Sequence, residues 1–284
     1  MGNGTIGTAS HPQSDGARPT NSGTSILPLE VLLTPNPIFR ALSTLRTFRV
    51  RFLLMGGQAC VLYGAAEFSR DADIAILAEP DNLQRLNDAL RELEAECIAL
   101  PPLSISYLRK GHAVHFRCRH PDARDLRIDI MSVMRGAPSF ATLWRRRTTV
   151  TTEDGTTFDL ISLPDLLRVK KTQRDKDWPM LRRLVEAHYV GNAQDPNADQ
   201  IAFWFREARS PAMLIQLVEQ YPDVLEREST KRPLLDLARD RRTDELEAAL
   251  QKEEQLEREA DRAYWLPLKK ELEQLRHDRR KRRK

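Results

Sequence analysis

Apolar residues have two kinds of spacing in the first part of the chain, one typical of strands and one typical of helices. Residues 50–55 alternate at first and then become wholly apolar, which is typical of a central strand, and Gly56-Gly57 ends the run. From Pro80 onward, leucines recur every three or four residues, as on the buried face of a helix. Helices are predicted from Asn36-Pro37, over 58–63 and from Pro80. Strands are predicted at 50–55, 71–77, 104–108, 113–118, 126–133 and 158–163.

The pattern changes after Pro164. No further convincing strand follows, and residues 164–190 and 199–277 have the spacing of helices, with breaks predicted at Pro211, Pro222, Pro233 and Pro267. The predicted fold class is therefore α+β, with a mixed β-sheet flanked by helices and followed by an all-α C-terminal region. The predicted divisions are a disordered leader (1–25), an α/β domain (26–163), a helical domain (164–266) and a basic tail, helical or disordered (267–284).

Composition narrows the class of protein. The 284 residues are 40% hydrophobic, enough for one or two domains with a real core, so collagen-like and wholly disordered chains are excluded. We find no uncharged apolar run long enough to span a membrane and no secretory order in the first 25 residues, so we expect a cytoplasmic protein with no membrane partner. Three scattered cysteines fit a reducing compartment.

Positive charge is concentrated at the C-terminal end. The net charge is +4, yet residues 267–284 alone hold nine Lys/Arg against three acids, a net of +6. The other 266 residues have a net charge of −2. The basic end could bind RNA or another polyanion nonspecifically, or it could simply be a solubilising end, and the sequence leaves both open.

Three aspartates are candidates for a metal site. Asp71 and Asp73 are two apart in a predicted strand, so both point to one side. Asp129 interrupts the apolar face of another predicted strand, and an unpaired buried carboxylate there would be costly. Oxygen ligands suit Mg²⁺, and two of these carboxylates could bridge a pair of ions about 4 Å apart.

Two other features bear on this site. Gly56-Gly57 lets the backbone approach a phosphate closely, and the N–H groups opening the following helix would point at the anion. His112, His115, Cys118 and His120 cluster in sequence, but their spacing matches no standard zinc pattern, and we predict no zinc there.

With these motifs the chain resembles the nucleotidyltransferase superfamily that includes DNA polymerase β. Its signature is a hydrophobic residue with Gly-Gly or Gly-Ser, then Asp-x-Asp on a strand, then a third Asp on a later strand. Met55-Gly56-Gly57, Asp71-Ala72-Asp73 and Asp129 match it. Within the superfamily the chain looks most like the stand-alone bacterial branch of AbiEii-type toxins from toxin–antitoxin systems.

That narrower resemblance depends on a downstream match, Leu163-Pro164-Asp165-Leu166 followed by Lys170, Arg174 and Lys176-Asp177. It implies that Lys170, Arg174 and Lys176 face the triphosphate, with Gly56, Gly57 and Ser69 also contacting phosphates. Glu67 and Met180 depart from the branch, which commonly has Arg and Asp there. The resemblance covers about residues 36–190.

The resemblance implies a Mg²⁺-dependent enzyme, with two ions, that moves a nucleoside monophosphate from an NTP to an acceptor hydroxyl. Asp71, Asp73 and Asp129 would hold the metal, and Asp129 would take the hydroxyl proton. RNA such as tRNA, a protein side chain or a small molecule, as in aminoglycoside adenylation, remain open as acceptors, and an antitoxin protein is an expected partner. The alternative is a noncatalytic RNA- or protein-binding module on the same scaffold, which Glu67 and the basic end favour.

Overall fold

The computed structural model describes residues 36–66, 68–152 and 155–282, so the predicted leader, 1–25, lies outside the described residues. Seven strands form one mixed sheet in the order β3-β4-β5-β2-β1-β7-β6. The central strand β1 runs antiparallel to β2 and parallel to β7, and β2 runs parallel to β5. The strands are β1 (Phe52–Met55), β2 (Asp71–Ile76), β3 (Glu96–Cys97), β4 (Val114–Arg117), β5 (Arg127–Met131), β6 (Thr148–Thr151) and β7 (Thr157–Leu160).

Helices flank this sheet, and the predicted α+β class is confirmed. All four residues of β1 are buried, as its apolar run predicts for a central strand, whereas β5 alternates between buried and half-buried positions. Asn36 caps the first helix by accepting a hydrogen bond from the Ile38 backbone N–H, and Pro37 opens it. These helices are α1 (Pro37–Thr47), α2 (Gly56–Leu62), α3 (Pro80–Glu92), α4 (Ile105–Lys110) and α5 (Phe140–Arg146).

The predicted strand at 104–108 is wrong, because this segment is helix α4. Ser104 caps it by accepting from the Tyr107 N–H, and Gly111 ends it with a φ of 99°, a left-handed conformation that glycine adopts without strain. These two local signals outweigh the β-forming Ile and Tyr side chains between them. The short strands β3 and β6 were not predicted; β6 pairs with β7 antiparallel at the edge of the sheet.

The C-terminal region is helical throughout the described residues after β7, as predicted. Pro211 and Pro222 are the first residues of α9 and α10, where a missing N–H costs nothing. The helices are α6 (Leu163–Lys170), α7 (Asp177–Asn192), α8 (Ala198–Glu207), α9 (Pro211–Gln220), α10 (Pro222–Ser229), α11 (Leu235–Arg239) and α12 (Thr243–Lys281).

The predicted break at Pro267 is wrong, because Pro267 lies inside the 39-residue helix α12. Side chains on either side of the proline are fixed to the rest of the protein: Asp261 binds the Gln173 N–H, and Glu271 binds Lys110 and His112. Pro267 has no backbone N–H, so one hydrogen bond of the helix is missing there. The contacts of Asp261 and Glu271 stabilise α12 on both sides of this position. Although α12 is long, it is rich in charged residues, and none of the described helices is both long and apolar enough to cross a membrane.

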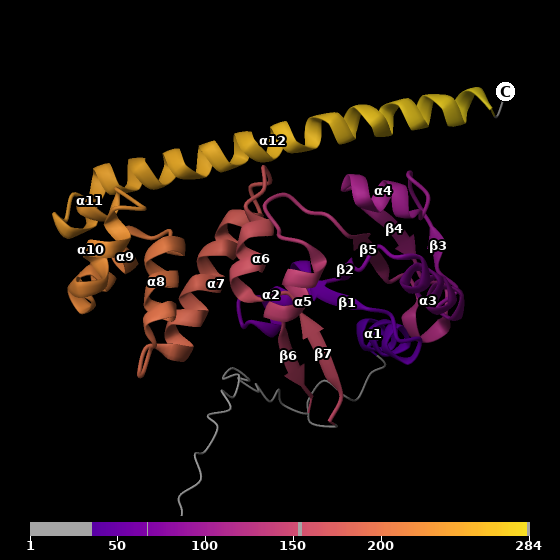
Figure 1. Ribbon diagram of the computed structural model, residues 1–284, viewed down its shortest axis with the longest axis horizontal. Coiled ribbons are helices and arrows are strands. Elements are labelled where there is room, and N and C mark those ends of the chain that lie inside the picture. The colour runs from indigo at the N-terminus through magenta and orange to yellow at the C-terminus, as the bar shows by residue number, and fades with distance from the viewer. Residues whose placement is uncertain (1–35, 67, 153–154, 283–284) are drawn as a thin grey trace, which may run out of the picture.

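Helix α12 connects the two regions of the molecule (Figure 1). It packs against α11 and α9 at its N-terminal end and extends along the molecule to the side of α4, with the sheet below it. Asp261 and Glu271 lie on the part of the helix that crosses the α/β region. The helical region therefore contacts the α/β region through one continuous element as well as through the chain connection at α6.

Candidate active site

The strand register brings the three predicted carboxylates onto one face of the sheet. Asp73 of β2 is aligned with Asp129 of the parallel strand β5, and Asp71 lies two residues earlier on β2. Aligned residues on neighbouring strands point to the same side, as do residues two apart on one strand. Asp71 and Asp73 are half-buried, and the Asp129 side chain is 16% exposed. The three aspartates thus share a face that opens to solvent at its margin.

The diglycine turn is packed directly against one of these carboxylates. Gly56 has a φ of 66°, and a Cβ on it would lie 1.9 Å from Oδ2 of Asp73. The Gly57 N–H donates to the same oxygen at 3.4 Å, and a Cβ on Gly57 would lie 2.4 Å from Oγ of Ser69. Both glycines are therefore required by neighbouring polar side chains at the start of α2, a requirement that the sequence alone did not indicate.

Negative charge is poorly compensated around Asp73. Burial raises the pKa of the Asp73 carboxyl above its ordinary value, and the nearby carboxylates of Asp129 and Asp71 raise it further. The Gly57 N–H and the Lys170 ammonium act in the opposite direction but do not outweigh them. A set of crowded oxygen donors of this kind fits a hard divalent cation such as Mg²⁺, which would relieve the repulsion.

Asp129 has partners of its own. Its Oδ1 accepts from Nε of Arg127 at 2.7 Å and contacts Nδ1 of His115 on β4 at 2.8 Å. Burial alone would raise its pKa, but His115 and Arg127 lower the pKa of Asp129 below its ordinary value. No group of three His, Cys, Asp or Glu side chains within the described ranges is arranged closely enough to hold a metal ion. The three aspartates share a face of the sheet, but the side-chain partners of Asp129 are Arg127 and His115.

His115 was not predicted as part of this site. It lies on β4 directly opposite Asp129 in the antiparallel register, so a correct pairing of the two predicted strands would have revealed it. The other members of its sequence cluster go elsewhere: His112 contacts Glu271 at 2.9 Å, Cys118 is buried, and His120 lies 3.4 Å from a guanidinium nitrogen of Arg40.

Two of the predicted phosphate-facing cations are bound to an internal carboxylate. Asp177, the first residue of α7, lies 3.2 Å from Nζ of Lys170 and 2.8 Å from Nε of Arg174, and it accepts from the Thr172 hydroxyl. Burial would raise the pKa of Asp177, but Lys170 and the other partners lower it below its ordinary value. We call these four residues the Asp177 cluster. Lys176 is exposed, and its side chain forms no ion pair with any described residue.

Lys170 links this cluster to the carboxylate face. It is only 11% exposed, and it lies close enough to Asp73 to act on the pKa of that carboxyl. Helix α6, which ends at Lys170, packs against α2, the helix that begins at Gly56. The structure therefore brings Lys170 to the aspartates, whereas Arg174 and Lys176 lie further along the exposed loop between α6 and α7.

Helix α12 fixes that loop from outside. Oδ2 of the buried Asp261 accepts from the Gln173 N–H at 2.9 Å, and Arg258 donates to the Gln173 carbonyl at 3.1 Å and to Asp175 at 2.5 Å. Both peptide groups of Gln173 are thus occupied by one helix. The loop carrying Arg174 and Lys176 is held in place beside the site by α12, far downstream in the sequence.

Comparisons with known proteins give limited information. No family model matches the chain, and no curated protein matches it. Among solved structures, a protein from H. pylori provisionally described as a nucleotidyltransferase is similar over 83% of this chain and 98% of its own, at 16% identity and a TM-score of 0.36. JHP933 from Helicobacter pylori is similar over 82% and 94% respectively, at 15% identity and a TM-score of 0.35. With TM-scores this low, the interpretation of the site depends on its own residues.

Proposed function

We propose that the protein is a Mg²⁺-dependent nucleotidyltransferase. An acceptor hydroxyl would attack the α-phosphorus of an NTP, the bond to the β,γ-pyrophosphate would break, and pyrophosphate would leave. The observation that carries the proposal is the alignment of Asp73 with Asp129 on parallel strands, with Asp71 on the same face and the Gly56-Gly57 turn against Asp73. Positioning and charge neutralisation account for most catalysis of phosphoryl transfer, and this face concentrates anionic oxygen donors.

Asp71, Asp73 and Asp129 are the residues that would hold Mg²⁺, as two ions. Because the three carboxylates are not close enough to hold an ion in the described structure, Asp129 would first have to exchange Arg127 for the cation. When bound, the cation would neutralise phosphate charge and favour deprotonation of the attacking hydroxyl. Asp129 would accept the hydroxyl proton. Because Arg127 and His115 hold its pKa low, Asp129 is a weak base at neutral pH, so the larger contribution of the site would be electrostatic.

The cationic groups would act on the leaving pyrophosphate. Lys170 lies beside Asp73, and Arg174 and Lys176 lie on the loop that α12 holds in place. Gly56, Gly57 and Ser69 would line the phosphate side of the site at the start of α2, where the Gly57 N–H, which donates to Asp73, would also face the phosphates. Lys170 and Arg174 are shared with Asp177, so a triphosphate would compete with that carboxylate for them.

The test uses labelled NTPs, Mg²⁺ and candidate acceptors (total RNA, cell lysate and a metabolite set), with wild type compared with Asp71→Ala/Asp73→Ala. Wild type should transfer label and the double variant should not. Equal labelling by both proteins would disprove the enzyme proposal for those acceptors. In parallel, Mg²⁺ or Mn²⁺ with NTP should raise the melting temperature of wild type, and an unchanged value would mean that the site does not assemble.

A toxin role in a toxin–antitoxin system, with an antitoxin as partner, is part of the proposal on the strength of the sequence motifs around Lys170 and Asp177. Induced expression should arrest growth, and Asp73→Ala should relieve the arrest. Growth arrest that persists in Asp73→Ala would separate toxicity from the proposed chemistry.

The Arg127–Asp129 ion pair favours a second candidate, the noncatalytic binding module. A carboxylate already neutralised by a guanidinium at 2.7 Å needs no metal. Replacing Arg127 by Gln distinguishes the two. An enzyme should gain metal affinity or keep its activity, because Asp129 is released, whereas a binding module should show no transfer with or without Arg127.

A further inference from the structure

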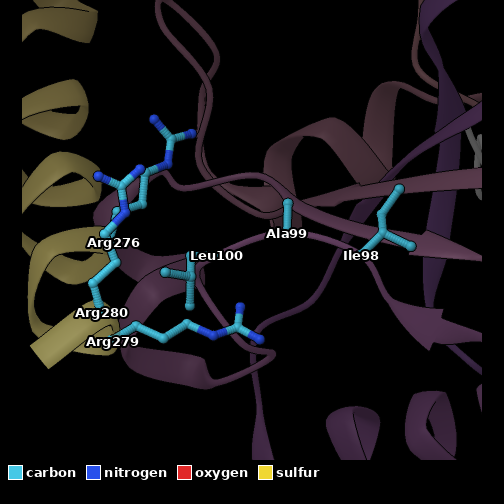
Figure 2. Close-up of a pocket in the computed structure, with 6 residues that line it drawn as sticks. All are labelled: Ile98, Ala99, Leu100, Arg276, Arg279 and Arg280. Atoms are coloured by element: carbon cyan, nitrogen blue, oxygen red, sulfur yellow. The ribbon is translucent and has the colours of Figure 1, made fainter. Parts of the chain in front are cut away.

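A basic pocket lies between the C-terminal end of α12 and the segment after β3 (Figure 2). One wall is the segment Ile98, Ala99 and Leu100, which follows strand β3. The other wall consists of Arg276, Arg279 and Arg280 on the last turns of α12. The pocket has a volume of about 400 Å³. We call it the α12 pocket.

The three arginines carry uncompensated positive charge. Their spacing of three and four residues places them along one side of the helix, and all three are exposed. None of them forms an ion pair with another residue in the described part of the chain, although 27 such pairs are found elsewhere in the molecule. Three guanidinium groups facing one pocket without a carboxylate partner repel one another, so an anionic ligand would be favoured there.

The facing wall is apolar. Ile98 is 42% exposed, one of the few large apolar side chains with that much exposure among the described residues, and Ala99 and Leu100 are half-buried. An inorganic anion would gain nothing from such a wall. The pocket therefore fits a ligand that has both negative charges and apolar surfaces.

The end of α12 is held firmly enough to keep this geometry. Glu271 lies 2.5 Å from Nζ of Lys110 and 2.9 Å from Nε2 of His112, which is buried, and Leu268 is buried one turn earlier. The arginines begin five residues beyond Glu271. They are thus presented over residues 98–100 by an anchored helix and not by a free tail.

We propose that the α12 pocket binds single-stranded nucleic acid, with phosphates on the three arginines and bases against the apolar wall. Arginine matches the geometry of phosphate oxygens, and the bases of a single strand are free to lie on an apolar surface or a guanidinium plane. A duplex keeps its bases stacked inside and would leave Ile98 and Leu100 uncovered. Lys281 and Arg282 continue the positive charge along the same helix end.

The pocket binds the strand whether or not the protein transfers nucleotides. That the strand is also the acceptor of the transferred nucleotide rests on the proposed function. The binding experiment therefore uses no NTP and no Mg²⁺, and it includes Asp71→Asn/Asp73→Asn, which should bind as wild type does. Wild-type protein that binds the strand but transfers no label in the separate labelling assay would contradict the proposed function alone.

The test measures fluorescence anisotropy of labelled RNA and DNA single strands of about 12 nucleotides, of one sequence, over a range of salt concentrations. Arg276→Gln/Arg279→Gln/Arg280→Gln should weaken binding about ten- to hundredfold near 0.1 M salt. It should also lower the slope of log affinity against log salt by about 2, since each lost phosphate contact on a single strand contributes roughly 0.7. Comparison of the RNA and DNA strands shows which of them the pocket prefers.

The matched control is Arg239→Gln/Arg241→Gln/Arg242→Gln, which removes the same charge at the other end of α12, where each arginine has an acidic neighbour. It should bind nearly as wild type does. Equal loss in both triple variants would overturn the proposal in favour of a general charge effect, as would unchanged binding in the pocket variant. A duplex that binds as tightly as the single strand would also overturn it.

A second variant tests the apolar wall without removing any arginine. Ile98→Glu places a carboxylate opposite the guanidinium groups and should weaken binding at least severalfold, whereas Ile98→Gln should weaken it less. Ile98 is 42% exposed and lies at the surface, so both variants should have melting temperatures close to that of wild type. Equal affinities for Ile98→Glu and wild type would overturn the role of this wall.

Discussion

Two aspartates of this protein, the half-buried Asp73 on the sheet and the buried Asp177 at the start of α7, have pKa values displaced in opposite directions. Burial and neighbouring carboxylates raise the pKa of Asp73, while Lys170, Thr172 and Arg174 lower that of Asp177 in spite of its burial. Asp177 has the surroundings of a structural ion pair, satisfied within the chain. Asp73 lies among carboxylates whose repulsion its partners do not offset, and functional sites commonly contain such perturbed ionisable groups.

The largest expected effect is on activity. Asp73→Asn keeps the shape of the side chain and its bond from Gly57, but it removes one of the crowded charges. We expect nucleotidyl transfer to fall about a thousandfold or more, as when a main electrostatic group is lost from a site, with no loss of stability. Transfer rates and urea denaturation measure the two effects.

Asp122→Asn, an exposed aspartate away from the site, is the control and should change neither rate nor stability. If Asp73→Asn keeps full activity, the contrast with Asp177 does not mark a catalytic face. If it destabilises the fold by several kcal/mol, Asp73 is a structural group like Asp177.

The next effect is on the turn that packs against Asp73. Gly56→Ala would place a Cβ 1.9 Å from Oδ2 of Asp73 at a φ of 66°. We expect a loss of about 3 kcal/mol in the free energy of unfolding, from backbone strain together with displacement of the carboxylate. Urea denaturation measures it, and any residual transfer activity should fall as well.

Gly64→Ala is a close control, because Gly64 has a similar φ of 74° but nothing lies within 4 Å of the added Cβ. It should cost about 1 kcal/mol, the strain alone. Equal losses in the two variants would mean that the packing of Gly56 on Asp73 contributes nothing.

Asp177→Asn probes the satisfied aspartate. Its carboxylate is 4% exposed and has three partners, so losing the charge should cost about 2 kcal/mol at neutral pH. Because the folded-state pKa lies below the ordinary value, the ionised group stabilises the fold at neutral pH, and this stabilisation is lost as the pH falls below about 4.

Urea denaturation at several pH values checks this. Wild type should lose more stability than Asp177→Asn between neutral pH and about pH 3. The control is Asp175→Asn, whose side chain is 97% exposed and should have little effect at any pH. Parallel pH profiles for Asp177→Asn and wild type would contradict the ion-pair interpretation.

The aligned carboxylates were predictable because strand periodicity is exact. Residues two apart must share a face, and the apolar runs around Asp73 and Asp129 mark both strands as central. The partners of Asp129 required the register: His115 comes from β4, and only correct pairing puts it opposite. Arg127 lies two residues before Asp129 on β5, so the two-residue rule that pairs Asp71 with Asp73 also places Arg127 beside Asp129.

The cations were harder to predict, because helix and loop spacing does not determine which anion a long side chain reaches. The resemblance assigned Lys170 and Arg174 to a triphosphate, whereas in the structure both form ion pairs with Asp177. The hydrogen bonds of Asp261 and Arg258 to the Gln173 backbone join positions more than 80 residues apart, for which the sequence gives no local signal.

The smallest expected effect concerns Lys176. Unlike Lys170 and Arg174, which pair with Asp177, Lys176 forms no ion pair with a described carboxylate. Since the ammonium is exposed and unpaired, Lys176→Gln should change stability by less than about 0.5 kcal/mol. If the loop faces the triphosphate, KM for NTP should rise about three- to tenfold with little change in kcat, as expected for a contact made equally in the ground and transition states. The control is Lys252→Gln, an exposed lysine on α12 away from the loop, which should leave both constants unchanged. A KM that stays at the wild-type value would remove Lys176 from the site and leave Lys170 as the cation best placed to meet the nucleotide.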